Sequence, residues 1–122
     1  MTEVYFFDSY AVMEILKGNT SYDKYKKNGI ILTKLNLFEI YHSIIFQFDE
    51  GMAEKVYGMY SPHVVDFSDD VIKNAAKFRL RHMKKRLSMA DCIGYVFSLK
   101  AGVKFLTGDR EFEKFENVEF VK

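Results

Sequence analysis

The chain alternates short apolar runs with longer segments in which apolar residues recur at helical spacing. The first run, Val4-Tyr5-Phe6-Phe7, has no polar interruption, which is typical of a strand covered on both faces. Four further runs predict strands at 30–32, 64–67, 103–106 and 118–121. Strands that alternate with helices favour an α/β fold, here a central parallel sheet of four to five strands with right-handed crossovers and helices on both faces.

The segments between these runs carry helix signals. Thr33, Ser68 and Ser88 are residue types that cap helix N-termini, and Gly18 and Gly102 are suited to ending helices. The expected helices span residues 9–17, 21–27, 34–50, 52–60 and 110–115, with two more that begin after Ser68 and Ser88.

Length and composition restrict the class of protein. The 122 residues suffice for one domain, 1–122, that buries about two-thirds of its unfolded surface. The single cysteine, Cys92, excludes an intramolecular disulfide and is expected as a small apolar residue in a reducing compartment. The N-terminus lacks a secretory signal pattern and no apolar run is long enough to span a membrane. We therefore expect a soluble, cytoplasmic protein without a membrane partner.

The net charge and the aromatic content of the chain indicate which partners it can bind. The net charge is only +1, so any affinity for nucleic acid must come from a local patch rather than from a global field. Aromatic residues make up 16% of the chain, which favours either a subunit interface or a core rich in aromatic rings. We expect a homodimer, with the apolar helix around 37–48 as the candidate surface.

Four acidic residues occupy equivalent places in the strand–helix pattern. Asp8 and Asp109 follow predicted strands, whereas Glu39 and Asp91 lie near the starts of predicted helices. In an open parallel sheet, ligands bind outside the carboxyl ends of the strands at the topological switch point. A buried carboxylate is costly unless a positive charge compensates it. The pattern therefore predicts that the four carboxylates converge there on a divalent cation.

Each acid also has a simpler explanation. Asp8 and Asp109 are well placed to cap the helices that follow them. Asp91 stands three residues after Ser88, which is the spacing of a capping box. Glu39 belongs to a polar stripe on its helix and could face water. Because the rest of that helix is apolar nearly all round, we expect the stripe to line a cleft instead.

The donor set indicates the metal and the reaction. Carboxylate oxygens suit Mg²⁺ or Mn²⁺, whereas zinc would favour His and Cys residues, which show no metal-ligand spacing here. Mg²⁺ keeps several waters and readily accepts phosphate oxygens as ligands. We therefore expect hydrolysis of a phosphodiester bond. Asp8 and Asp91 are the expected direct or water-mediated ligands, and Glu39 and Asp109 would complete the shell or orient the attacking water.

The same residues resemble the motifs of the PIN domain family. Phe7-Asp8-Ser9 ends the first strand, Leu87-Ser88-Met89-Ala90-Asp91 opens a late helix, and Leu106-Thr107-Gly108-Asp109-Arg110-Glu111-Phe112 lies near the C-terminus. Together with Glu39 they occur in the family's order over essentially the whole chain. The similarity is greatest to the short VapC-type toxins of prokaryotic toxin–antitoxin pairs.

This resemblance implies a magnesium- or manganese-dependent ribonuclease that is usually dimeric and is inhibited by a small antitoxin protein. It assigns acid roles to the same four residues and supporting hydroxyl roles to Thr107 and Ser9. A PIN nuclease outside a toxin pair, or a non-catalytic RNA- or protein-binding PIN module, remains an alternative.

A basic run precedes the helix that carries Asp91. It holds five positive charges in eight residues: Arg79, Arg81, Lys84, Lys85 and Arg86. Cations are favourable at a helix C-terminus, so the run could simply end the preceding helix. Alternatively, these cations bind the phosphates of RNA and guide it into the acidic cleft.

Other α/β classes fit less well. A receiver domain would need paired acids after its first strand and a Lys near its last strand. Here Asp8 stands alone, and no Lys lies between the predicted strand at 103–106 and Asp109. Nucleotide-binding enzymes would show a G-x-G-x-x-G or P-loop motif, and neither is present.

Overall fold

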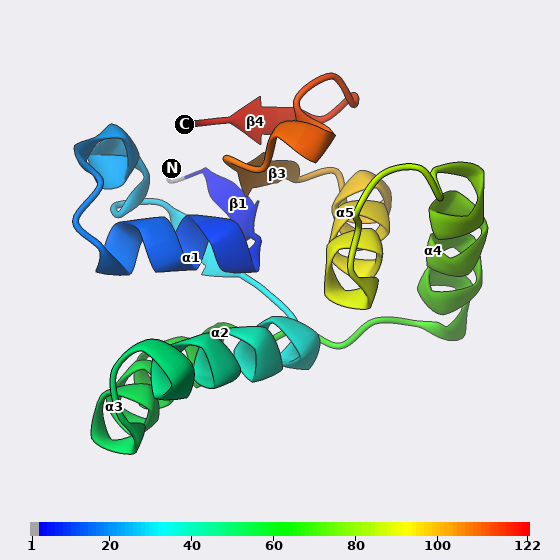
Figure 1. The fold of residues 1–122 in the computed structure, drawn as a ribbon. Coiled ribbons are helices and arrows are strands. Elements are labelled where there is room, and N and C mark those ends of the chain that lie inside the picture. The colour runs from blue at the N-terminus through cyan, green and yellow to red at the C-terminus, as the bar shows by residue number, and fades with distance from the viewer. Residues whose placement is uncertain (1–2) are drawn as a thin grey trace.

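The structure, a computed structural model, describes residues 3–122 and is built around one parallel sheet (Figure 1). Four strands pair in the order β2-β1-β3-β4, and all pairings are parallel. Their bounds are Val4–Phe7 (β1), Gly29–Ile31 (β2), Lys104–Thr107 (β3) and Val118–Phe120 (β4). This confirms the predicted α/β class, with four strands rather than five.

Within residues 3–122, five α-helices connect the strands. They are Ser9–Leu16 (α1), Lys34–Gln47 (α2), Glu50–Tyr60 (α3), Asp69–Arg81 (α4) and Met89–Ala101 (α5). The segments predicted as helices at 21–27 and 110–115 form shorter 3₁₀ helices, Thr20–Tyr25 and Arg110–Phe112. Within residues 3–122, no helix is both long and apolar enough to cross a lipid bilayer.

The predicted helix caps are confirmed. The side chains of Thr33, Ser68 and Ser88 accept hydrogen bonds from backbone N–H groups in the first turns of α2, α4 and α5. Gly102 ends α5 with a φ of 71°, a left-handed conformation in which glycine is favoured because it has no Cβ.

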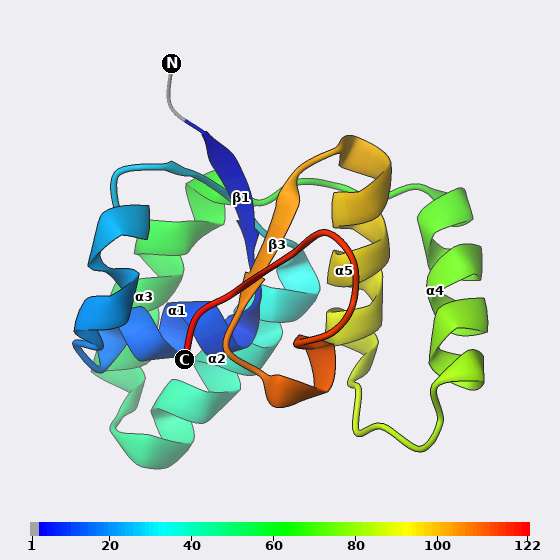
Figure 2. The same ribbon diagram turned by 90° about the horizontal axis from the view of Figure 1, so that it is seen from above.

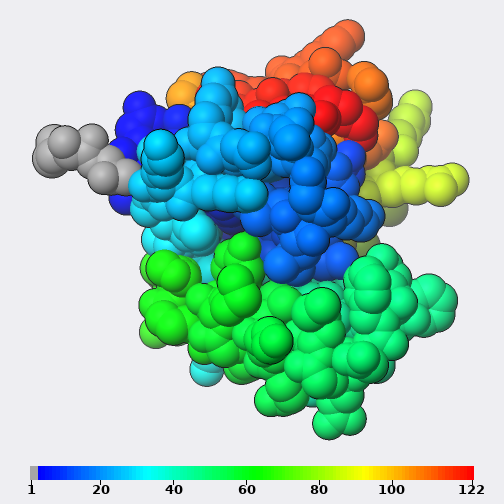
Figure 3. Space-filling model, turned by 90° about the vertical axis from the view of Figure 1, so that its left-hand side faces the viewer, coloured from blue at the N-terminus to red at the C-terminus, as the bar shows by residue number. Residues whose placement is uncertain are grey.

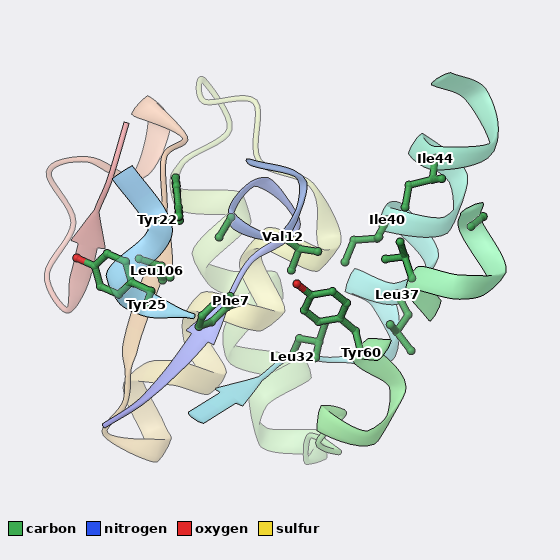
Figure 4. Close-up of a cluster of buried hydrophobic side chains, with 13 residues drawn as sticks. Phe7, Val12, Tyr22, Tyr25, Leu32, Leu37, Ile40, Ile44, Tyr60 and Leu106 are labelled. Atoms are coloured by element: carbon green, nitrogen blue, oxygen red, sulfur yellow. The ribbon is translucent and has the colours of Figure 1, made fainter. Parts of the chain in front are cut away.

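Two apolar cores lie on opposite faces of the sheet, because successive residues of a strand point to opposite sides. Phe7 packs into the core with α1, α2 and α3, whereas Phe6 packs into the core with α4 and α5. Figure 2 shows α1 and α3 on one side of the strands and α5 and α4 on the other. Figure 4 shows the first core, in which Val12, Leu32 and Ile40 surround Tyr60.

The predicted strand at 64–67 is wrong. Only one parallel bridge forms there, between Leu32 and Val64, and it is followed by the hydrogen bond from Val65 N to Leu32 O at 2.8 Å. Tyr60 lies in the first core, whereas Phe67 packs against the second. The segment between them therefore leads from the core on one face of the sheet to the core on the other.

Although α2 is apolar nearly all round, it is not buried all round. Leu37, Ile40 and Ile44 are buried, but Phe38 is 71% exposed and Phe46 is 85% exposed. The α2–α3 hairpin forms a separate layer below α1, as the space-filling view shows in green (Figure 3). Part of its apolar surface consequently faces outward.

The strand order defines where a ligand would bind. β1 lies between β2 and β3, so the chain leaves β1 toward one side of the sheet and leaves β3 toward the other. The gap between these two exits is the topological switch point of the sheet. Asp8 directly follows β1, and Asp109 comes two residues after β3.

Candidate active site

Asp8 is the buried acid of this region. Its side chain is 1% exposed, and its Oδ1 accepts a hydrogen bond from the Ala11 N–H at 2.8 Å, which caps α1. Proximity to the Thr107 hydroxyl lowers the pKa of Asp8, against the larger effect of burial. Asp8 N donates to Leu106 O at 3.3 Å, so the end of β1 is fixed to β3.

Thr107 links Asp8 to the second acid, Asp109. Its hydroxyl lies close enough to Asp8 to lower the pKa of that carboxyl, and the same oxygen accepts from Asp109 N at 3.0 Å. Asp109 Oδ1 in turn accepts from Glu111 N at 2.9 Å and caps the 3₁₀ helix. The buried Thr107 side chain thus holds the turn after β3 against the end of β1.

Asp91 enters the site from the first turn of α5. Its Oδ2 accepts from Ser88 N at 2.9 Å, while Asp91 N donates to Ser88 Oγ at 3.0 Å. The capping box predicted from the sequence is therefore present, and it does not remove the carboxylate from the site.

Glu39 is connected to α1 through a hydroxyl. Ser9 Oγ donates to Glu39 Oε1 at 2.7 Å and accepts from Asn36 Nδ2 at 3.1 Å. The buried Asn36 also accepts, through its Oδ1, from Thr33 N and Thr33 Oγ1 at 3.0 and 2.9 Å. A continuous set of hydrogen bonds therefore runs from the N-cap of α2 to the Glu39 carboxylate.

The four carboxylates affect one another electrostatically. Burial raises the pKa of Asp8 well above its usual range, and repulsion from Asp91 and Asp109 adds to this rise. Burial, followed by repulsion from Glu39 and Asp109, raises the pKa of Asp91 to about 6. Because Coulomb repulsion weakens with distance, these couplings show that acids from four separate segments lie near each other.

The donor chemistry of this cluster fits a hard divalent cation. The second oxygens of Glu39, Asp91 and Asp109 have no hydrogen-bond donor among the described residues. No fully buried side-chain oxygen within residues 3–122 lacks a partner, so these three oxygens reach accessible space. A cation there would relieve the repulsion that raises the pKa values.

The arrangement does not, however, form a closed ion cage. Within residues 3–122, no group of three or more His, Cys, Asp or Glu side chains is placed to surround a metal ion. Each of the three Asp carboxylates points one oxygen toward a nearby backbone N–H.

A groove of about 520 Å³ opens beside this cluster, between α1 and α2. Ser9 and Glu39 form part of its wall, together with Tyr10, Phe38 and His42. The prediction that Glu39 lines a cleft agrees with this position.

A family model for the PIN domain matches residues 5–118. The chain belongs to the PIN domain family. Among curated protein sequences, none matches it.

Solved structures show the same fold at low sequence identity. A toxin–antitoxin complex from Klebsiella pneumoniae superimposes with a TM-score of 0.73 at 12% identity, covering 94% of this PIN domain chain and 95% of the other. VapBC2 from Rickettsia felis, bound to a DNA fragment from its promoter, gives 0.72 at 16% identity, covering 98% and 99%. VapC20 from Mycobacterium tuberculosis, a toxin that cleaves the sarcin–ricin loop, gives 0.73 at 14% identity, covering 96% and 99%.

The basic run lies at the turn between α4 and α5 of this PIN domain. Arg79 Nε donates to Leu87 O at 3.1 Å, and Lys85 Nζ lies 5.3 Å from the centre of the Phe115 ring. Arg81, Lys84 and Arg86 are exposed. Within residues 3–122, none of the five cations forms a salt bridge. Part of the run therefore fixes the turn, and the rest is available to solvent.

Sequence reasoning missed one polar residue and one surface of the site. Asn36 was visible as a member of the polar stripe on α2, but only the structure shows that it supports Ser9. The groove residues Phe38 and His42 were not predicted, because an aromatic side chain in a sequence cannot be assigned to a core or to a surface.

Proposed function

We propose that the protein is a Mg²⁺- or Mn²⁺-dependent endoribonuclease and the toxin of a type II toxin–antitoxin pair. The observation that carries this proposal is the group of four mutually repelling carboxylates at the switch point of a PIN domain sheet. Carboxylates in such a group favour a bound cation, and a divalent cation there favours phosphodiester hydrolysis. The proposed reaction would take place in the cytoplasm, where RNA is found.

Asp8 and Asp91 would hold the cation, and Glu39 and Asp109 would complete its shell or orient the attacking water. The cation, when bound, supplies an acidified water and neutralises the charge that develops on phosphate. Thr107 keeps Asp8 and Asp109 in register through its one hydroxyl. Ser9 holds one oxygen of Glu39 and leaves the other free to accept a proton from water.

The toxin assignment is supported by the structural neighbours, which include complexes of VapC-type proteins with their antitoxins. A small antitoxin protein is the expected inhibitor, since a nuclease that cleaves cellular RNA must be restrained. A short reading frame that overlaps the gene or lies directly upstream would supply it.

We also propose a homodimer. Exposed apolar side chains on α2 and α3, including Ile45, Phe46 and Met59, give the hairpin a surface that a second protein chain can cover. Light scattering at tens of micromolar protein tests this, with a monomer as the contradicting result.

A non-catalytic PIN module that binds RNA or protein is the second candidate. The incomplete ion cage favours it, because each Asp already has a structural use as a helix cap. A PIN nuclease outside a toxin pair would share the site but lack the antitoxin.

The deciding experiment is incubation with a panel of single-stranded and structured RNAs, with Mg²⁺, with Mn²⁺ and with EDTA. The wild-type protein should cleave only with a divalent cation, and Asp8→Asn should not cleave at all. The variant should remain folded, because an Asn oxygen can still accept the hydrogen bond from Ala11 N. Equal cleavage by both proteins would reject the assignment of Asp8.

A further inference from the structure

The groove between α1 and α2 is continuous with the acidic cluster. Its lining includes Ser9 and Glu39, which also belong to that cluster through their 2.7 Å hydrogen bond. A volume of about 520 Å³ lies in the range of sites that hold a small ligand or one nucleotide unit. Any occupant of this groove would therefore lie next to the carboxylates.

Aromatic rings stand on both walls of the groove. Tyr10 comes from α1, while Phe38 and His42 come from α2. The Phe38 and His42 rings are stacked on each other, with centroids 6.2 Å apart and planes inclined by 18°. Because Phe38 is 71% exposed, its ring is not used by the core of the protein. Exposed rings in such a place can stack on unpaired bases.

The Tyr10 side chain, on the α1 wall of the groove, is held in place by Lys122. Lys122 Nζ donates to Tyr10 Oη at 2.8 Å and to Gly108 O at 3.1 Å. Gly108 precedes Asp109, and a Cβ at this position would lie 2.4 Å from the Tyr10 ring. The Tyr10 side chain is thereby fixed against the turn that carries one of the acids.

The groove carries its net negative charge at Glu39, next to the proposed cation. Its two oppositely charged members away from the acid cluster, Glu14 and Lys17, approach within 3.8 Å of each other. Glu14 also accepts from Asn19 Nδ2 at 2.8 Å. This part of the groove is therefore close to electrically neutral and offers mainly ring and methylene surface.

We propose that this groove binds an unpaired base of the RNA substrate, next to the phosphate that is cleaved, and that Phe38 is the ring on which the base stacks. The inference rests on the proposed nuclease function and adds to it the side chain that receives a base beside the cut. A base inside a duplex cannot enter, since its faces are already covered by its neighbours.

The test measures binding rather than cleavage, in an Asp8→Asn background. The probe is a single-stranded RNA decamer with 2-aminopurine at its centre, and the same decamer annealed to its complement. Phe38→Ala removes the ring, Phe38→Tyr keeps it, and Phe46→Ala is the matched control. Phe46 lies on the same helix and is even more exposed, at 85%, but does not line the groove.

Phe38→Ala should weaken binding of the single strand by about 5- to 100-fold and abolish the quenching of 2-aminopurine. Phe38→Tyr and Phe46→Ala should bind as the parent does, and the duplex should bind weakly to all four proteins. Equal affinity of Phe38→Ala and Phe46→Ala for the single strand would overturn the proposal and leave the groove to a protein segment. Equal binding of single strand and duplex, or no RNA binding by the parent, would overturn it as well.

Cleavage by the protein with Asp8 intact, measured in parallel, separates this inference from the proposed function. If the protein cleaves RNA but Phe38→Ala and Phe46→Ala bind it equally, only the base site in the groove is rejected. If Phe38→Ala alone weakens RNA binding but the protein does not cleave RNA, the proposed nuclease function is rejected and the base site is kept.

Discussion

At the scale of single residues, each Asp of the site has two uses at once. Asp8, Asp91 and Asp109 all accept a hydrogen bond from a nearby backbone N–H, and all take part in the mutual repulsion of the cluster. The two explanations of these residues that the sequence left open are therefore compatible. A cap uses one carboxylate oxygen and leaves the other for a ligand.

The raised pKa of Asp91, caused by burial and then by repulsion from Glu39 and Asp109, predicts a pH dependence of stability without metal. The folded protein keeps the Asp91 proton up to a pKa of about 6, whereas the ordinary value is 3.8. Between these values the folded state binds more protons than the unfolded state, so the free energy of unfolding falls as pH rises and the loss is complete above pH 6. Asp91→Asn should remove this loss and raise the free energy of unfolding in EDTA at pH 7 by about 1–2 kcal/mol.

Urea unfolding in EDTA at pH 4 and at pH 7 measures this effect. Asp49→Asn is the control, because Asp49 caps α3 by accepting from Met52 N at 2.8 Å but lies at an exposed site. It should change the free energy of unfolding little at either pH. An Asp91→Asn protein that is less stable than the parent at pH 7 would show that the cap outweighs the repulsion.

The positions of the acids were predictable from the sequence, but their supports were not. Asp8 and Asp109 follow apolar runs, so the topology of a parallel sheet brings them together. The role of Asn36 depends on which side chain of α1 faces α2, and that depends on packing between residues 27 positions apart. Such a contact leaves no local pattern.

At the scale of elements, helices were predicted better than strands. Caps such as Thr33 and Ser88 act within one turn, so their signal is local. The apolar run at 64–67 has the composition of a strand, yet it makes only one bridge, at Val64, on its way from the core that holds Tyr60 to the core that Phe67 contacts. Tertiary connectivity therefore overrides local preference there.

Two glycines in helices should respond oppositely to alanine. At Gly94 in α5, a Cβ would lie 2.6 Å from the ring of the buried Phe6, and at Gly58 in α3 it would meet nothing within 4 Å. Gly94→Ala should lower the free energy of unfolding by about 1–3 kcal/mol through overpacking. Gly58→Ala should raise it by about 0.5–1 kcal/mol through helix propensity.

Urea unfolding of both variants against the parent protein checks this pair. Since the chemical change is the same, the difference between the two isolates the approach of α5 to β1. A Gly94→Ala protein as stable as the parent would mean that α5 lies farther from the sheet than described here.

At the scale of the whole molecule, the exposed cations at the α4–α5 turn predict a salt-dependent affinity for RNA. Lys84→Ala with Arg86→Ala should weaken binding and reduce the slope of log affinity against log salt by about 1–2, as expected when two phosphate contacts are lost. Lys26→Ala with Lys27→Ala removes the same charge elsewhere and should leave the slope unchanged. Equal slopes for both double variants would restrict the basic run to ending α4.

The central claim is that carboxylates from four distant segments share one divalent cation. Calorimetric titration of the protein with Mn²⁺ tests it most directly, with Asp8→Asn and Asp91→Asn beside the parent and Asp49→Asn as the control. The parent and Asp49→Asn should bind Mn²⁺ with the release of protons at pH 6, where Asp91 is still partly protonated. The two site variants should not bind. Equal Mn²⁺ binding by all four proteins, or none by the parent, would contradict the claim.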